Sequence, residues 1–386
     1  MRNMKTYIRY LLISLPAVCG LFSSCTDDIQ PGTSADGTGQ VTLSYTISGA
    51  VQSRAEAGDN ALNENTINRL DLFIFPADGG ETIHRVNEPN VEDAQNGTYN
   101  TWTFAMDDLS PADIADNDQI YLIANCPNVA DITTLSDLQK ACVENLTCNA
   151  IQTSFLMDGK GTLSQNGNDA TIQVDLKRAL AKIRLTVNNE SDANASYAYQ
   201  FVNYAPNSAV LEEGETDFLA SNNAILQTTS STAEDGMIPA TGAETMQQDG
   251  KLVLYSYAND WYKSNASLDP NPDISGGTVV DGDQIYTDAP IDPEKQTYIL
   301  LKAPFNGKEW YYKVPVNYQL PENNDEIGIV ADTYKDLYRL QRNYIYDITV
   351  TIDREGGPEK EPVVLTNLTY SVNGWQDEGI VPPAVD

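Results

Sequence analysis

The stretch Val41–Arg54, VTLSYTISGAVQSR, decides the fold expected for this chain of 386 residues. Apolar side chains stand at every second position, at Val41, Leu43, Tyr45 and Ile47, and the residues between them are Thr or Ser. This period of two predicts a β-strand with one face in a core and the other face toward water.

The predicted strand ends at Arg54, and residues 55–65, AEAGDNALNEN, are polar and rich in small side chains. An arginine before such a segment is a place where a protease with an acidic specificity pocket could cut. A cut between Arg54 and Ala55 would release the first strand as one edge strand and leave the rest of the chain whole. The alternative is an ordinary first strand and loop, since Arg85 and Arg354 also lie in loop-like sequence.

The N-terminus has the pattern of an export signal. Three bases within the first nine residues precede an apolar run, residues 10–22, that is too short to cross a membrane comfortably. Small residues then precede Cys25, which predicts a bacterial lipoprotein signal over residues 1–24 and a lipid such as palmitate on Cys25. A plain secretory signal is the alternative, and either one exports the protein.

The chain is strongly acidic. Asp and Glu number 55 against 23 Lys and Arg, a net charge of −32, and removal of residues 1–24 with their three bases leaves 20 − 55 = −35. Such a surface repels nucleic acid and anionic lipid. We therefore expect no nucleic-acid partner, and membrane contact only through the lipid of the precursor.

Three cysteines remain after the signal and the lipidation site, namely Cys126, Cys142 and Cys148. An odd number excludes a complete disulfide framework. Cys142 and Cys148 could pair in an oxidising compartment, or all three could be free and buried.

Alternating apolar residues between Pro- and Gly-rich turns predict a chain made mainly of strands. We expect strands at 68–76, 98–106, 118–125, 197–202, 251–257, 296–302, 309–316, 343–353 and 362–375. One helix is expected at 135–146, with Ser136 as its cap. The fold class is therefore all-β with minor helix.

The organisation that follows is two tandem β-sandwich domains. A tether and removable first strand occupy residues 25–54, and the domains occupy 55–180 and 181–386. The basic, apolar-alternating run 171–188 is expected to be the hinge between them.

Few residues in this sequence suggest catalysis. The single histidine, His84, is expected in a polar loop, and the motifs of Ser hydrolases, P-loop proteins, zinc proteases and C-x-x-C redox proteins are absent. We expect no enzyme, no cofactor and no metal site. The aromatic residues of 255–262 and 310–312 could stack on sugars, although packing is their commoner use.

Several stretches together resemble the fimbrillin family of Bacteroidales, the subunits of protease-assembled (type V) pili. They are the lipoprotein signal, Ser53-Arg54-Ala55, INRLDLFIFPADG (67–79), DQIYLIAN (118–125), VDLKRALAKIRLTV (174–187), LQRNYIYDITVTIDREGGP (340–358) and SVNGW (371–375). The resemblance implies transthyretin-like sandwiches and an outer-membrane lipoprotein precursor that becomes part of a cell-surface fimbria for adhesion.

The resemblance also implies a mechanism and partners. An arginine-specific protease removes the tether and first strand, and a strand from a copy of the chain or another pilus subunit fills the groove. Host or bacterial surface receptors are further possible partners. Stalk, tip and anchor positions stay open, and so does a surface adhesin or glycan-binding module that never polymerises.

The donor strand is expected in residues 363–375, VVLTNLTYSVNGW, which follow a Gly-Gly-Pro turn. Its candidate side chains are Val364, Leu365, Leu368, Tyr370, Val372 and Trp375. A bulge near residues 366–367 would bring most of them to one face. In the alternatives, this segment is the last strand of its own domain, or the donor is 380–385, where two prolines oppose regular pairing.

Overall fold

The computed structural model describes most of the chain as strands, turns and a few short helices. The described residues are 39–47, 62–82, 84–88, 101–106, 109–214, 226–241, 245–261, 278–280, 283–285, 294–317, 339–365 and 367–375. Within these ranges no helix is long and apolar enough to cross a membrane. The described residues all belong to one compact unit.

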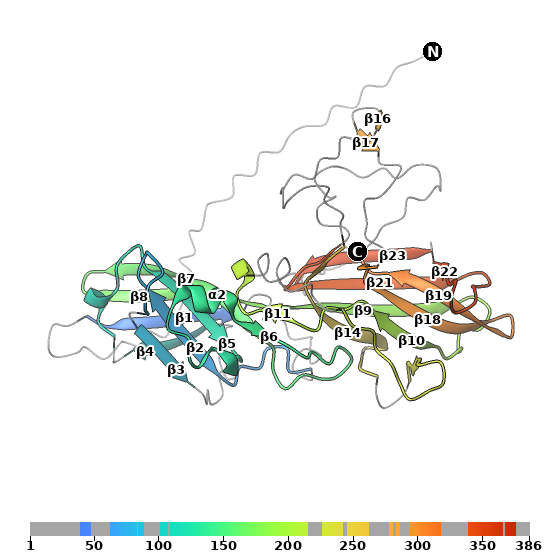
Figure 1. The fold of residues 1–386 in the computed structure, drawn as a ribbon, viewed down its shortest axis with the longest axis horizontal. Helices are drawn as coiled ribbons and strands as arrows, with labels where there is room; N and C mark the ends of the chain where they lie inside the picture. The colour runs from blue at the N-terminus through green and yellow to red at the C-terminus, as the bar shows by residue number, and fades with distance from the viewer. Residues whose placement is uncertain are drawn as a thin grey trace, which may run out of the picture. The chain divides into compact units, whose positions relative to one another are not determined.

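The first sandwich contains seven strands. They are β1 Val41–Ile47, β2 Leu70–Phe75, β3 His84–Glu88, β4 Thr101–Met106, β5 Gln119–Ala124, β7 Met157–Asn166 and β8 Asp169–Arg178. Their hydrogen-bonded order is β3-β2-β5-β7-β8-β1-β4 (Figure 1). All six residues of β2 are buried, and its one carboxylate, Asp71, is held by Arg69 Nε at 2.6 Å. The nearly continuous apolar sequence of this strand is therefore typical of a strand that is buried on both faces.

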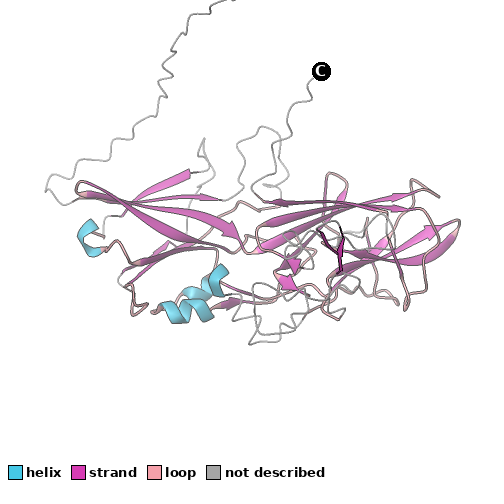
Figure 2. Cartoon of the chain, turned by 90° about the horizontal axis from the view of Figure 1, so that it is seen from above, coloured by secondary structure: helices cyan, strands magenta, loops and turns pink. Residues whose placement is uncertain are grey.

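The second sandwich contains two five-stranded sheets. Their strands are β9 Leu180–Asn189, β10 Ala198–Val202, β12 Ile238–Pro239, β13 Gln247–Gln248, β14 Lys251–Tyr257, β18 Tyr298–Phe305, β19 Lys308–Pro315, β21 Tyr344–Ile352, β22 Val363–Val364 and β23 Leu368–Gly374. One sheet has the order β12-β10-β18-β19-β22 and the other β13-β14-β9-β21-β23. Figure 2 shows the strands in facing layers, with helix confined to a few short pieces. The predicted all-β fold is thus confirmed.

Short elements complete the described chain. Two-stranded pairs form between β6 Cys142–Val143 and β11 Ser208–Ala209, between β15 Asn259–Asp260 and β20 Arg339–Leu340, and between β16 Thr278–Val280 and β17 Asp283–Ile285. Single 3-10 turns occur at Pro111–Asp113, Pro127–Val129 and Glu212–Gly214.

The helix α2, Leu135–Lys140, is shorter than predicted, and its predicted cap is wrong. Thr134 is the N-cap, because its hydroxyl accepts a hydrogen bond from the Asp137 backbone N–H at 3.2 Å. The chain becomes extended at Ala141 because the next residues pair with β11. His84 also differs from expectation, since it begins β3 rather than lying in a loop.

The predicted hinge is two strands, β8 and β9, joined at Ala179. β8 belongs to the first sandwich and β9 to the second, so the sheet changes at this residue. The core of the first sandwich continues into the second, because its cluster of buried side chains includes Tyr255, Ile345 and Trp375. The division into domains 55–180 and 181–386 stays a prediction.

Candidate functional site: the groove that holds strand β1

Strand β1 lies inside its sheet rather than at its edge. It pairs in parallel with β8 from Val41–Ala170 to Ile47–Leu176, and antiparallel with β4 from Val41–Met106 to Thr46–Thr101. The expectation that β1 is an edge strand is therefore wrong, because β4 occupies that edge. Loss of β1 would open a groove with a strand on each side.

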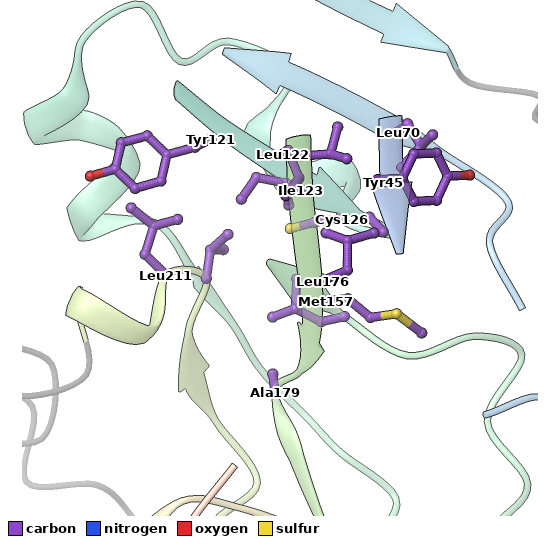
Figure 3. Packing of buried hydrophobic residues seen from close by; sticks show 14 of the residues in the cluster. Tyr45, Leu70, Tyr121, Leu122, Ile123, Cys126, Met157, Leu176, Ala179 and Leu211 are labelled. Carbon is purple, nitrogen blue, oxygen red and sulfur yellow. The ribbon is translucent and has the colours of Figure 1, made fainter. Parts of the chain in front are cut away.

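The four alternating side chains of β1 fill this groove from within. Val41, Leu43, Tyr45 and Ile47 are 0%, 5%, 0% and 2% exposed. In Figure 3, Tyr45 belongs to the same cluster of buried side chains as Leu70 of β2 and Leu176 of β8. At about 1.5–3 kcal/mol for each buried side chain, the four contribute roughly 6–12 kcal/mol.

The outward side of β1 is tied to β8 at both ends. At the start, the Gln40 N–H donates to Asp169 Oδ1 at 2.9 Å, and at the end, the Thr46 hydroxyl donates to Asp175 Oδ1 at 2.9 Å. A shift of one residue along the strand would break both bonds and turn the apolar face outward. The two aspartates of β8 therefore help to fix the register of whatever strand lies beside them.

We expect alkaline pH to loosen β1 through Tyr45. Burial raises the pKa of the Tyr45 hydroxyl above its ordinary 10.0, so this group stabilises the fold below that pH and loses its contribution as pH rises toward the folded value. Each pH unit above about 10 costs about 1.4 kcal/mol at this residue. Between about pH 8 and pH 11, Tyr45→Phe should therefore lose less unfolding free energy in urea than the unchanged chain does, by about 1.4 kcal/mol.

The matched control for this experiment is Ser44→Ala, which alters the outward face of the same strand. Its pH dependence should equal that of the unchanged chain. Equal alkaline losses in Tyr45→Phe and in the unchanged chain would contradict the role of Tyr45.

The predicted processing residues, Cys25, Arg54 and Ala55, lie outside the described residues. The description stops at Ile47, at the end of β1, and resumes at Leu62. Their roles stay predictions.

The donor candidates lie in their own sandwich. Val364 lies in β22, which pairs with β19, and Leu368, Tyr370 and Val372 lie in β23, which pairs with β21. The predicted bulge is wrong, because the chain crosses from one sheet to the other between Leu365 and Leu368. Each strand is the last of its sheet, so this segment closes one edge of both sheets.

Exposure differs widely among these candidates. Val364 is 39% exposed, whereas Leu365 and Trp375 are both 0% exposed. Leu365 thus packs into the core of the second sandwich, Trp375 packs into the cluster that continues from the first sandwich, and Val364 faces outward.

The three cysteines are free. Burial raises the pKa of Cys126 to about 11 and that of Cys148 to about 12, so neither thiol forms a reactive thiolate near neutral pH. Among the aromatic residues that could stack on sugars, Tyr255, Trp261 and Tyr312 are fully buried and belong to the core.

Residues 39–178, which include β1 and both of its neighbours, match the family model described as major fimbrial subunit protein (FimA). Among curated proteins, no sequence matches the chain.

Solved structures that match this chain include cell adhesion and fimbrial proteins. A candidate cell adhesion protein from Parabacteroides distasonis is 16% identical, with 88% of this chain and 97% of that chain covered and a TM-score of 0.48. The tip fimbrial protein Mfa3 from Porphyromonas gingivalis is 12% identical, with 87% of this chain and 99% of that chain covered and a TM-score of 0.47. A fimbrilin (FimA) from the same species is 13% identical, with 86% of this chain and 96% of that chain covered and a TM-score of 0.47. The match to the family model shows that residues 39–178 of this chain resemble the major fimbrial subunits (FimA). This match confirms the predicted likeness to the fimbrillins.

Proposed function

We propose that this chain is the precursor of a cell-surface fimbrial subunit that assembles when β1 is exchanged for a strand of a neighbouring subunit. The observation that carries the proposal is the internal position of β1 between β8 and β4. Its removal would leave two unpaired strand edges and an apolar groove between them. Such edges seek another strand, and a donor would pair on both sides at once.

The position of Arg54 supports a protease trigger. Six residues separate Ile47 from Arg54, and fifteen separate Arg54 from Leu70 at the start of β2. One cut after Arg54 would therefore release β1 whole without entering another described strand. The same cut would remove Cys25 and its lipid, so anchoring to the outer membrane and storage as a monomer would end together.

The donor is proposed to come from the C-terminal end of a neighbouring subunit. β22 and β23 are edge strands, so they can leave without separating other strand pairs. The full burial of Leu365 and Trp375 opposes their departure, because it would uncover apolar surface in the parent sandwich. We therefore propose that the donated part includes the residues beyond Trp375.

The test is Arg54→Ala in cells that make the fimbriae. The uncut chain should reach the surface folded and keep β1, so filaments should be lost in electron micrographs while monomer accumulates. Arg354→Ala is the matched control, because it removes an exposed arginine, paired with Asp353 at 3.0 Å, from a different part of the chain. N-terminal sequencing of filaments from the unchanged chain should begin at Ala55.

Filaments made of Arg54→Ala chains that still begin at Cys25 would overturn the proposal. A wild-type chain found on the cell surface only as a monomer would instead favour an adhesin that never polymerises.

A further inference from the structure

A buried cluster of polar and aromatic side chains joins distant parts of the chain at the junction of the two sandwiches. Its members, here called the Glu64 clasp, are Glu64, Arg178, Lys182, Tyr255, Asn343 and Trp375. They come from the turn before β2, from strands β8, β9 and β14, and from the residues that flank β21 and β23. Apart from Trp375, which the sequence also predicts as a donor residue, none of them belongs to the groove of β1 or to the donor candidates.

The Glu64 carboxylate lies at the centre of the clasp. Lys182 Nζ lies 2.8 Å from Oε1 and 3.1 Å from Oε2, and the Tyr255 hydroxyl donates to Oε1. All three side chains are 0% exposed. A buried charge is tolerated only when it is paired and hydrogen-bonded, so these contacts hold the turn of Glu64 against β9 and β14.

Arg178 connects this turn to the C-terminal end. Its Nε donates to the Glu64 carbonyl oxygen at 3.0 Å, and its guanidinium lies 4.7 Å from the centre of the Trp375 ring. Lys182 Nζ lies 5.7 Å from the same ring. Cations over an indole face are attracted to it, more strongly where water is excluded.

Asn343 completes the connection through the backbone. Its carbonyl oxygen accepts from the Trp375 N–H at 2.7 Å, and its side-chain oxygen accepts from the Arg178 N–H at 3.2 Å. Trp375 is therefore held by its ring and by its backbone. Arg178 and Lys182, which face the ring, also contact Glu64, and Asn343, which holds the backbone, contacts Arg178.

We propose that the Glu64 clasp sets the limits of the two exchangeable ends. Glu64 is the tenth residue of a chain that begins at Ala55, and Trp375 is followed by eleven residues. The clasp would keep everything between them in place, so that only β1 leaves at one end and only the residues beyond Trp375 are free to reach a neighbour. This role rests on the proposed function, whereas the coupling of the two ends does not.

The two ends are expected to open together because they share the same charges. Replacing the Glu64 carboxylate takes away the anion that faces Lys182 and leaves two buried cations near one indole ring. The lost charge pairing therefore destabilises the packing of Trp375 as well as the turn of Glu64. By contrast, β18 lies in the opposite sheet of the second sandwich and has no member in the clasp.

The test is hydrogen exchange on the full, uncut chain with Glu64→Gln. Protection should fall by the same factor at residues 62–67 and 368–375, by about 100-fold or more. Protection at residues 299–303 of β18 should fall by a smaller factor. Glu213→Gln is the matched control, because it breaks the half-exposed pair with Lys160 and should change protection by no more than about twofold.

If Glu64→Gln does not fold, Tyr255→Phe removes one hydrogen bond from Glu64 and should give a smaller fall, up to about tenfold, again equal at both ends. A fall at 62–67 alone would overturn the clasp, and so would an equal fall at 299–303. Because this measurement needs no filaments, failure to polymerise would contradict the proposed function and leave the clasp standing.

Discussion

A chain that begins at Ala55 will lose most of the stability of its first sandwich. The loss follows from the four buried side chains of β1, worth roughly 6–12 kcal/mol, whereas a whole domain is stable by only about 5–15 kcal/mol. Unfolding in urea should therefore show an early transition for the Ala55 chain. A chain that begins at Gly39 is the matched control, because it lacks the signal and most of the tether but keeps β1.

Adding back the missing strand as a peptide tests the same groove directly. A peptide of residues 40–48 should restore the lost transition, since it supplies the apolar face and the partners of Asp169 and Asp175. The same peptide with Leu43→Asp should not, because it would bury a charge without a partner. Identical urea transitions for the Ala55 and Gly39 chains would contradict the importance of β1.

The strands that the sequence predicted well have either one buried and one exposed face or a continuous buried run. In β1 the burial alternates strictly, and in β21 it alternates along most of the strand. β14 was predicted with its exact ends because a continuous apolar run is bounded by Gly250 and by the polar residues after Tyr257. Local pattern is sufficient where burial is regular.

The sequence did not predict β7, because few of its side chains are buried and its apolar residues form no clear pattern. Only its first three residues are buried, and the remaining seven, mostly polar, are exposed or half-buried. Gly159 and Gly161 are needed there because a Cβ on either would lie within 2.6 Å of an atom of a neighbouring strand. Close approach between strands is a tertiary property that composition does not reveal.

The surroundings of β1 were also beyond the sequence. Nothing in residues 41–47 tells that β4 covers their outer edge, because the partner strand is sixty residues away. The Glu64 clasp was missed for a similar reason. Glu64 lies in a polar stretch that reads as a solvated loop, and only the fold brings Lys182 and Tyr255 to it.

Replacing Arg342 with methionine should cost about 3–5 kcal/mol of unfolding free energy at neutral pH. Arg342 Nη2 lies 2.9 Å from Asp158 Oδ1, and the two side chains are 3% and 9% exposed. Burial raises the pKa of Asp158, and the arginine opposes that rise. Without Arg342, the Asp158 carboxylate would stay buried with only the Glu212 N–H, at 3.0 Å, among its strong partners.

The pH dependence of this loss has a definite sign. A carboxyl whose folded pKa is raised stabilises the fold in its protonated form, and this contribution disappears as pH rises through the folded value. Urea unfolding of Arg342→Met should therefore recover part of its loss between about pH 7 and pH 5. Asp158→Asn combined with Arg342→Met should recover most of it at neutral pH, because no buried charge is left. A loss below about 1 kcal/mol in Arg342→Met would mean that the pair behaves as an exposed one, since exposed pairs contribute no more than that.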